Sequence, residues 1–405
     1  WNYPDTPALI QQLGRATTFL PFWYLTYLHP NGVATLLEIL LPLAAALLLS
    51  SRKIVFRLVL VVQIVVLGYA LFLTFSRGAW LSVGAAAGLA LALALLARLP
   101  RRAAVALIMI AAVVIIAGAA ILLLGADRLP FLQSTLTTAG SRLTLYSNTL
   151  YLATDYAYTG IGLGSTFAMV YSRYSLLIFV PFLTYAHNLL LAVWLAQGLL
   201  GLVALLGIML VFYRLVYRTI RRTQPDALFH GAWLGVTATF IHGLTDARQY
   251  VESPWAMPVL FVVLGLAAAL ARLAFAETED RADRDTLAVR SYGVRRAVVL
   301  VAGLVITAGA VVVFQSPLRA LWYVNRGALA ETRAELAPEL NDAERSQLTT
   351  AALSAYQTAL ALEPTLPNTN RRLGNLYVAL GQYAEAVPLL ETAADAEPNY
   401  PAAVK

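Results

Sequence analysis

The chain is dominated by apolar runs of about 20 residues, the length at which a helix crosses the hydrocarbon core of a bilayer. Short basic stretches separate these runs. Hydrophobic residues make up 60% of the 405 residues and charged residues only 13%, whereas a soluble domain carries nearly twice that charged fraction. The sequence therefore predicts an all-α fold, a polytopic bundle of membrane helices.

Eight membrane spans are predicted from these runs. They cover residues 33–50, 54–75, 79–97, 103–124, 187–213, 227–244, 255–271 and 297–314. Lysines and arginines gather in every second connection, and such basic loops face the cytoplasm. The remaining connections are then predicted to face outward. They include a long loop of about residues 125–187 and everything after Gln315.

The charge balance and residue usage narrow the function. The net charge of +7 comes from the basic connections between spans, so it reflects membrane topology and we do not expect nucleic-acid binding. The chain has no cysteine, so thiolate metal sites are excluded. Because it begins with Trp1 instead of Met, we expect further helices upstream.

Residues 316–405 follow a different pattern and are predicted to form an outward-facing domain after a membrane domain of residues 1–315. Small, aromatic and proline residues recur there with the 34-residue period of tetratricopeptide repeats. The positions are Ala352, Tyr356, Ala359 and Pro364, then Leu373, Gly374, Tyr377, Ala386, Ala393 and Pro398. We expect a third repeat to start at Pro401, and we expect the tail to bind a protein partner or to position an acceptor.

Two arginines lie on the side predicted to face outward, against the usual inside bias of basic residues. Arg77 follows the second span, and Arg142 lies within the long loop. A guanidinium keeps its charge at any relevant pH, and its planar fork matches phosphate oxygens. The pair therefore indicates an anionic lipid headgroup. The plainer alternatives are that Arg77 snorkels from a helix end, and that Arg142 pairs with Asp127 or Asp155.

Histidines border the same face. His187 opens the fifth span, where an imidazole can accept a proton near neutral pH and Asn188 can orient it or a substrate hydroxyl. A structural role for His187 stays open. His242 and Asp246, spaced i,i+4 at the end of the sixth span, share one helix face. They form either a proton relay or a helix-end hydrogen bond.

Missing features also constrain the chemistry. No carboxylate occurs between Glu38 and Asp127, so the hard oxygen ligands of a metal-dependent glycosyltransferase are missing from the expected site. No metal and no cofactor are therefore expected. We interpret Gly160-x-Gly162-x-Gly164 as a tight turn whose backbone approaches a ligand closely. The spans carry no charged residue near their middle, which disfavours an ion-coupled transporter.

Several stretches, in this order along roughly residues 30–270, resemble the O-antigen ligase and polymerase superfamily of bacterial membrane glycosyltransferases. They are Pro30-Asn31, Ser76-Arg77-Gly78-Ala79-Trp80, Ser141-Arg142, Gly160-x-Gly162-x-Gly164-x-x-Phe167, Tyr185-Ala186-His187-Asn188 and Gly198-x-x-Gly201. The resemblance implies metal-independent transfer of a glycan from an undecaprenyl-diphosphate carrier. By the same resemblance, Arg77 and Arg142 hold the diphosphate, and His187 assists the acceptor hydroxyl.

The predicted enzyme is therefore an inverting glycosyltransferase of the bacterial plasma (inner) membrane with an outward-facing site. Its catalytic residues are His187, Arg142 and Arg77, and we add Asn188, His242 and Asp246 as substrate-binding residues. The acceptor is a glycan, a lipid or a protein. Two other functions stay open: a transporter or flippase of lipid-linked glycans, and a membrane-anchored tetratricopeptide scaffold without chemistry.

Overall fold

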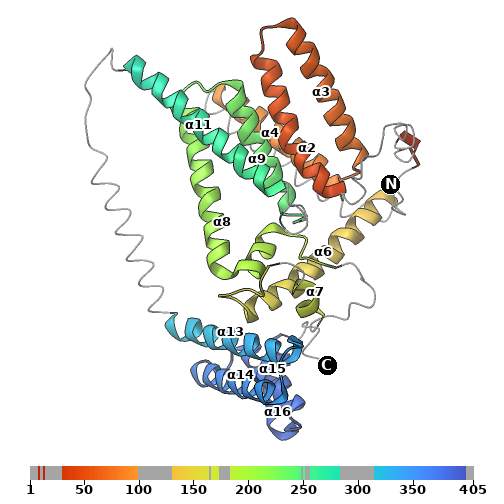
Figure 1. Cartoon of the computed structure of the whole chain (residues 1–405), viewed down its shortest axis with the longest axis vertical. Helices are drawn as coiled ribbons and strands as arrows, with labels where there is room; N and C mark the ends of the chain where they lie inside the picture. Colours follow the sequence, from red (N-terminus) through yellow and green to blue (C-terminus); the bar gives the residue numbers. More distant parts are fainter. Residues whose placement is uncertain are drawn as a thin grey trace. The chain divides into compact units, whose positions relative to one another are not determined.

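The computed structural model describes residues 8–9, 12–13, 30–98, 130–163, 166–172, 183–247, 250, 256–282 and 314–397. These residues form helices and connecting turns, which confirms the predicted all-α fold (Figure 1). In chain order the helices are α2 (Pro30–Ser50), α3 (Ile54–Leu73), α4 (Arg77–Arg98), α6 (Pro130–Asp155), α7 (Thr166–Tyr171), α8 (Leu189–Arg222), α9 (Ala227–Gly243), α11 (Ala256–Ala282), α13 (Gln315–Leu336), α14 (Asp342–Leu362), α15 (Pro367–Ala379) and α16 (Tyr383–Ala396).

Four of the described helices are long and apolar enough to cross a membrane, so the chain is a multi-pass membrane protein. They are α2, α3, α8 and the Ala256–Thr278 part of α11. The predicted spans 79–97 and 227–244 form α4 and α9, which are not among these four. The predicted span 103–124 and residues 297–313 of the last predicted span lie outside the described residues. Eight crossings therefore remain a prediction.

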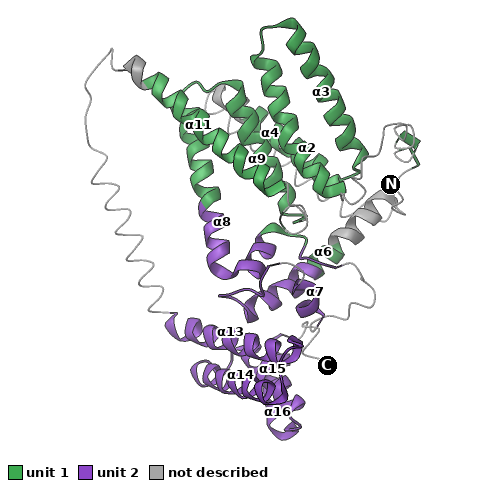
Figure 2. Cartoon of the chain, in the orientation of Figure 1, with its two compact units in different colours: residues 1–144, 187–189, 208–280 green, residues 145–186, 190–207, 281–405 purple. Residues whose placement is uncertain are grey.

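The chain divides into two compact units (Figure 2). Unit 1 comprises residues 1–144, 187–189 and 208–280, and unit 2 comprises residues 145–186, 190–207 and 281–405. Helices α6 and α8 each run from one unit into the other. Unit 2 thus combines a large part of the long loop with the C-terminal tail.

Helix α9 is the most enclosed element of unit 1. It packs against both α2 and α4, and α2 also packs against α3. Small residues allow the close approach of α9 to α2. A Cβ at Gly231 would lie 2.6 Å from the Ala46 Cβ, and one at Gly235 would lie 2.9 Å from the Ile39 carbonyl oxygen. A side chain at either glycine would push the helices apart, so these glycines allow the first half of α9 to lie against α2.

The turn between α3 and α4 is held by aromatic side chains. Phe75 adopts a φ of 52°, which is uncommon for a bulky residue. The Trp80 ring stacks on Phe72 at a centroid distance of 5.5 Å and meets Phe75 edge-on at 5.7 Å. Its indole N–H donates to the Leu71 carbonyl at 3.0 Å. These contacts fix the start of α4, where Arg77 lies.

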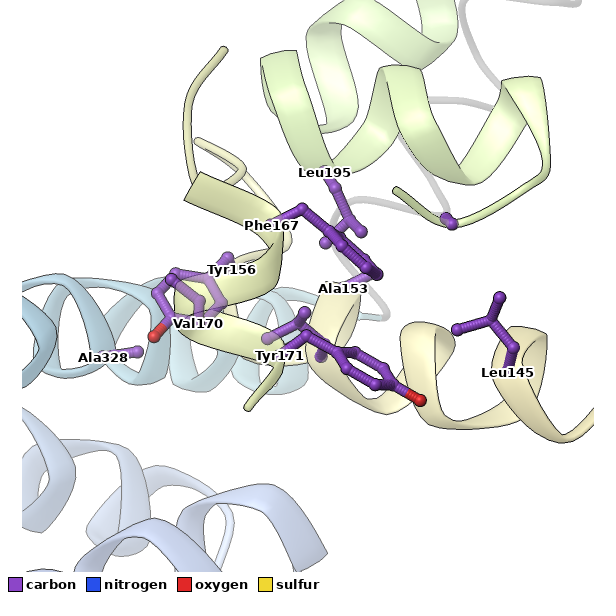
Figure 3. Close-up of a cluster of buried hydrophobic side chains, with 10 residues drawn as sticks. Leu145, Ala153, Tyr156, Phe167, Val170, Tyr171, Leu195 and Ala328 are labelled. Atoms are coloured by element: carbon purple, nitrogen blue, oxygen red, sulfur yellow. The ribbon is translucent and has the colours of Figure 1, made fainter. Parts of the chain in front are cut away.

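The core of unit 2 is formed by the loop together with α8 and α13. Its buried side chains are Leu145, Leu152, Ala153, Tyr156, Phe167, Val170, Tyr171, Ala186, Leu195 and Ala328. Figure 3 shows the Phe167 side chain directed toward Leu195 and the Tyr156 ring beside Ala328. Phe167 and Tyr171 stack at 5.1 Å. Tyr156 and Tyr171 are therefore core residues of a folded loop.

Helix α8 bends at Gly198, and residues 157–161 in the middle of the long loop dock into the bend. Gly160 and Gly198 both adopt left-handed backbone conformations, with φ of 66° and 70°. A Cβ at Gly160 would lie 2.3 Å from the Leu195 carbonyl oxygen, and one at Gly198 would lie 2.0 Å from the Tyr158 carbonyl oxygen. The close backbone approach predicted at Gly160 is thus made to α8.

The tail forms two helix pairs, α13 with α14 and α15 with α16. The predicted repeat positions Ala352, Tyr356, Ala359, Leu373, Ala386 and Ala393 are all buried. Gly374 lies against Leu390, sixteen residues later, and Gly327 lies against Tyr356, twenty-nine residues later. Both pairs therefore pack in the same way. The opening helix of the first pair, however, lies thirteen residues further upstream than in the second.

Candidate functional site

Polar side chains of unit 1 converge on Asp246, just past the end of α9. This carboxylate is almost fully buried. Its Oδ1 lies 3.7 Å from Nδ1 of His187. Its Oδ2 accepts a hydrogen bond of 2.5 Å from the side-chain amide of Asn31, a residue 215 positions away in the chain. The fold thus brings the start of α2, the end of the long loop and the end of α9 to one point.

The charge of Asp246 is set by its neighbours. Burial alone would raise the pKa of this carboxyl. His187, and after it the charges of His242 and Arg142, outweigh burial and hold the pKa of Asp246 well below its usual range. Asp246 is therefore an anion at physiological pH and forms the negative centre of the site.

Arg142 lies close enough to this centre for its charge to act on both Asp246 and His242. The side chain is partly exposed, and its guanidinium makes no hydrogen bond to another described residue. Of its two alternative partners, Asp155 binds Arg371 and Arg372 in unit 2. Asp127 lies outside the described residues. Arg142 thus has the exposure and the charge that an anionic ligand requires.

Arg77 lies at the start of α4, directly before a residue that contacts the cluster. It is the first residue of α4 and is partly exposed. The next residue, Gly78, lies against the His242 ring, because a Cβ there would be 2.9 Å from Cδ2 and 3.0 Å from Nε2. The start of α4 therefore borders the same site as Arg142.

His242 pairs with Glu38 of α2, and the two form a buried extension of the site. Its Nδ1 lies 3.1 and 3.3 Å from the two carboxylate oxygens of Glu38. The Ser82 hydroxyl of α4 donates to the same carboxylate at 2.9 Å. All three side chains are fully buried. Of the two alternatives predicted for His242 and Asp246, the helix-end hydrogen bond is present, because the backbone N–H of Asp246 donates to the His242 carbonyl at 2.9 Å. Neither ring nitrogen of His242 hydrogen-bonds to Asp246.

The prediction that no charged residue lies near the middle of a span is wrong at Glu38. This residue is the ninth of the 21 in α2. An ionisable group inside a membrane span is costly and marks a functional position by default. Glu38 is tolerated because His242 and Ser82 supply the hydrogen bonds that its burial requires.

His187 combines a strained backbone with partial exposure. Its φ is 50°, a left-handed conformation that histidine adopts more readily than most residues but still uncommonly. Its side chain is 24% exposed, while that of Asp246 is 2% exposed. The amide of the neighbouring Asn188 donates to the Leu244 carbonyl at 3.0 Å and ties the loop to the end of α9. Strain of this kind concentrates at functional sites.

The site therefore contains residues that the sequence did not single out as functional. Asn31 appeared only as part of the Pro30-Asn31 stretch, and Ser82 has no distinguishing signal in an apolar helix. Glu38 had a usable signal, because it is the single carboxylate of the α2 run. Among the described residues, no group of three or more His, Cys, Asp or Glu side chains is arranged as a metal site.

Comparison with known protein families indicates which class of enzyme this geometry belongs to. Residues 62–206 match O-antigen ligase, and residues 346–405 match the tetratricopeptide repeat. The chain carries an O-antigen ligase domain. No curated protein and no solved structure matches the chain.

Both parts of the predicted resemblance are thus confirmed, and the chain is an enzyme of glycosyl transfer. The matched segment of the ligase domain contains Arg77, Arg142, His187 and Asn188. Glu38, His242 and Asp246 lie outside it, although the fold joins them to His187 and Arg142. The ligase domain implies a lipid-linked glycan as substrate, and the repeats suggest a protein interaction.

Unit 2 contains a cavity of about 380 Å³ between α7 and the C-terminal part of α13. Its lining is mainly apolar and includes Val170, Leu329 and Leu336, with Arg333 as its charged member. A glycan presents many hydroxyls, which need polar partners when they leave water. The apolar lining of this cavity therefore does not suit a glycan.

Proposed function

We propose that this protein transfers a glycan from undecaprenyl diphosphate to an acceptor hydroxyl at the outer face of the bacterial plasma membrane. The observation that carries the proposal is the 3.7 Å distance between the imidazole of His187 and the buried carboxylate of Asp246. The charge of Arg142 acts on the same carboxylate, so we group a cation that suits a diphosphate with an imidazole that suits a hydroxyl proton.

In the proposed step, the acceptor oxygen forms a bond to the anomeric carbon while the bond from that carbon to the diphosphate breaks. The hydroxyl proton passes to the imidazole of His187. Undecaprenyl diphosphate leaves as an anion stabilised by Arg77 and Arg142, which replace the divalent cation of metal-dependent enzymes. Attack opposite the leaving group inverts the anomeric configuration.

The other members of the cluster orient these groups. The carboxylate of Asp246 stabilises the imidazolium that forms when His187 takes the proton, as the aspartate of a hydrolase triad does. Glu38 holds His242 through Nδ1 and thereby fixes the wall beside Gly78. Asn188 keeps the end of the loop against α9 and borders the substrate site. Each of these groups acts on substrate through position or charge.

The outward orientation rests on loop charge. The connections after α3 and the long loop are poor in basic residues, while Arg221 and Arg222 end α8 and other basic residues follow α2. Basic connections stay on the cytoplasmic side. We therefore place Arg77, Arg142, His187 and the tail on the outer side, where lipid-linked glycans are used.

Purified full-length protein in liposomes with labelled undecaprenyl-diphosphate glycan tests the proposal. Three acceptors are offered separately: a second lipid-linked glycan, a glycolipid core and a protein. We expect label to move to one acceptor with equimolar release of undecaprenyl diphosphate, and the rate to be unchanged by EDTA. Mass analysis of the product identifies the acceptor class. No transfer to any of them, with the glycan still on its carrier, would contradict the proposal.

The burial of Glu38 inside a span favours one second candidate, a flippase of lipid-linked glycans. That activity uses the arginines only to bind. The same liposomes distinguish the two functions, because a flippase moves labelled lipid across the bilayer while the glycan stays attached.

A further inference from the structure

The first helices of the two repeats, α13 and α15, contact a segment of the chain's own loop, residues 155–159. Repeat proteins bind their partners through the surface that adjacent repeats form together. The side chains of this surface that hydrogen-bond to the segment include Asn325 and Thr332 from α13 and Arg371 and Arg372 from α15. Residues 155–159 of the same chain therefore occupy this surface.

One half of the contact is ionic. Arg371 Nη2 donates to both carboxylate oxygens of Asp155 at 2.9 Å, and Arg372 Nε donates to one of them at 2.8 Å. Arg372 Nη1 also donates to Glu331 at 3.0 Å. Two guanidinium groups thus face two carboxylates, and all four side chains are buried. Buried charges persist only when they are paired in this way.

The other half uses neutral hydrogen bonds. The side-chain oxygen of Asn325 accepts from the backbone N–H groups of Tyr158 and Thr159 at 2.9 and 3.2 Å, and its amide donates to the Thr159 hydroxyl at 3.0 Å. The Tyr156 hydroxyl bonds to that of Thr332 at 2.5 Å. The Tyr158 hydroxyl donates to the Leu318 carbonyl at 3.0 Å. The repeats therefore bind backbone as well as side chains of the segment.

Helix α8 holds the segment from another direction. The Trp194 indole N–H and the backbone N–H of Leu199 both donate to the Ala157 carbonyl, each at 2.9 Å. Ala157 lies between Tyr156 and Tyr158, which contact the repeats. The segment is thus enclosed by ligase-domain and tetratricopeptide helices of the same unit.

We propose that this tetratricopeptide surface is the binding site for the protein's own loop, so that the tail is a built-in clamp on the ligase domain. Its positioning residues are Asn325, Arg371 and Arg372. A separate protein could use the surface only by displacing residues 155–159 with the buried Asp155. A partner that docks elsewhere on the tail is compatible with the clamp.

Hydrogen exchange of the full-length protein tests the clamp directly. In the wild type, the amides of Tyr158 and Thr159 are expected to exchange at least about 100-fold more slowly than in an unstructured peptide, because both donate to the buried Asn325. Unprotected exchange there, with the amides of α14 still protected, would overturn the proposal. This measurement needs no substitution and does not depend on a variant that folds.

Two substitutions at one position sharpen the result. Asn325→Leu removes both acceptor contacts at similar volume, whereas Asn325→Asp keeps an oxygen for the two N–H groups. We expect the first variant to lose the protection of Tyr158 and Thr159 at least tenfold and the second to keep it. Equal protection in both variants would count against the clamp.

Discussion

Among the described residues, each of the two units buries two carboxylates, but the partners of these carboxylates differ. In unit 1, Asp246 and Glu38 face His187 and His242. In unit 2, Asp155 and Glu331 face Arg371 and Arg372. Histidine gains and loses its proton near neutral pH, while arginine keeps its proton at every relevant pH. The first cluster has the groups to move a proton, and the second has only the groups to hold a position.

The solvent exposure of the side chains also differs between the two clusters. The His187 side chain is 24% exposed, whereas those of Arg371 and Arg372 are 4% and 5% exposed. A substrate can therefore reach the histidine but not the arginines of the clamp. Buried charge alone does not indicate a catalytic site. Its partner's chemistry and its access to solvent decide what it does.

The largest effect on activity is expected at His187. His187→Asn removes the imidazole but keeps a residue that tolerates the left-handed conformation. Loss of a general base lowers the transfer rate by roughly 100-fold or more. The rate is expressed per folded molecule, because the substitution also removes a partner of the buried Asp246. His230→Asn, at a histidine paired with Trp233 elsewhere on α9, is the matched control and should stay within about twofold of wild type. Transfer by His187→Asn at the control rate would place the base elsewhere.

In unit 2, a substitution is expected to lower the free energy of unfolding. Asp155→Asn leaves two buried guanidinium groups without their shared carboxylate and should lower the free energy of unfolding by about 3–5 kcal/mol. Chemical denaturation of the purified protein measures this change. Asp395→Asn, on the exposed face of α16, is the control and should change it by less than about 0.5 kcal/mol. If the two variants unfold alike, the ionic network does not stabilise the clamp.

The depressed pKa of Asp246 predicts a particular dependence of stability on pH. A carboxyl whose folded pKa is lowered contributes stability that is complete above its unfolded pKa of about 4 and is lost as the pH falls toward the folded value. Asp246→Asn should therefore cost about 1–3 kcal/mol between pH 5 and 8. The difference from wild type should shrink below about pH 4. A cost that grows on acidification would mean that the carboxyl is protonated in the fold.

The smallest effects on the transfer rate are expected at Glu38 and Ser82, in the buried extension of the site. Glu38→Gln keeps the shape but replaces one of the two carboxyl oxygens that face His242, and should lower transfer about tenfold. Ser82→Ala removes one hydrogen bond to the same carboxylate and should cost about twofold to fivefold. Initial rates at saturating donor measure both. The opposite order would assign the greater role to the hydroxyl.

The parts of the fold set by local pattern could be predicted from the sequence. The apolar runs predict 33–50 and 54–75, and the helices are Pro30–Ser50 and Ile54–Leu73. Repeat spacing likewise predicts the buried face of α14, with Ala352, Tyr356 and Ala359. The division of the chain at residues 315/316 stays a prediction. Periodicity succeeds here because each element buries a face that its own sequence specifies.

Other features depend on partners far away in the chain. Nothing near Asp155 indicates that its partner is Arg371, 216 residues later. The extra residues between Gly327 and Tyr356 break the repeat period and conceal α13 as the first helix of a pair. Glu38 becomes part of the site only when α9 brings His242 to it. Local pattern carries no information on such contacts, because tertiary packing decides them.

The initial rate of glycan transfer by purified Arg142→Ala tests most directly whether the cluster of unit 1 performs the transfer. This rate is compared with those of wild type and Arg221→Ala, each per folded molecule. Arg142→Ala should be slower by about 100-fold or more, because the departing diphosphate loses its cation. The transfer rate of Arg142→Lys should lie between those of wild type and Arg142→Ala. Arg221→Ala should keep the wild-type rate, because Arg221 is exposed. A rate for Arg142→Ala within about threefold of wild type would contradict the account.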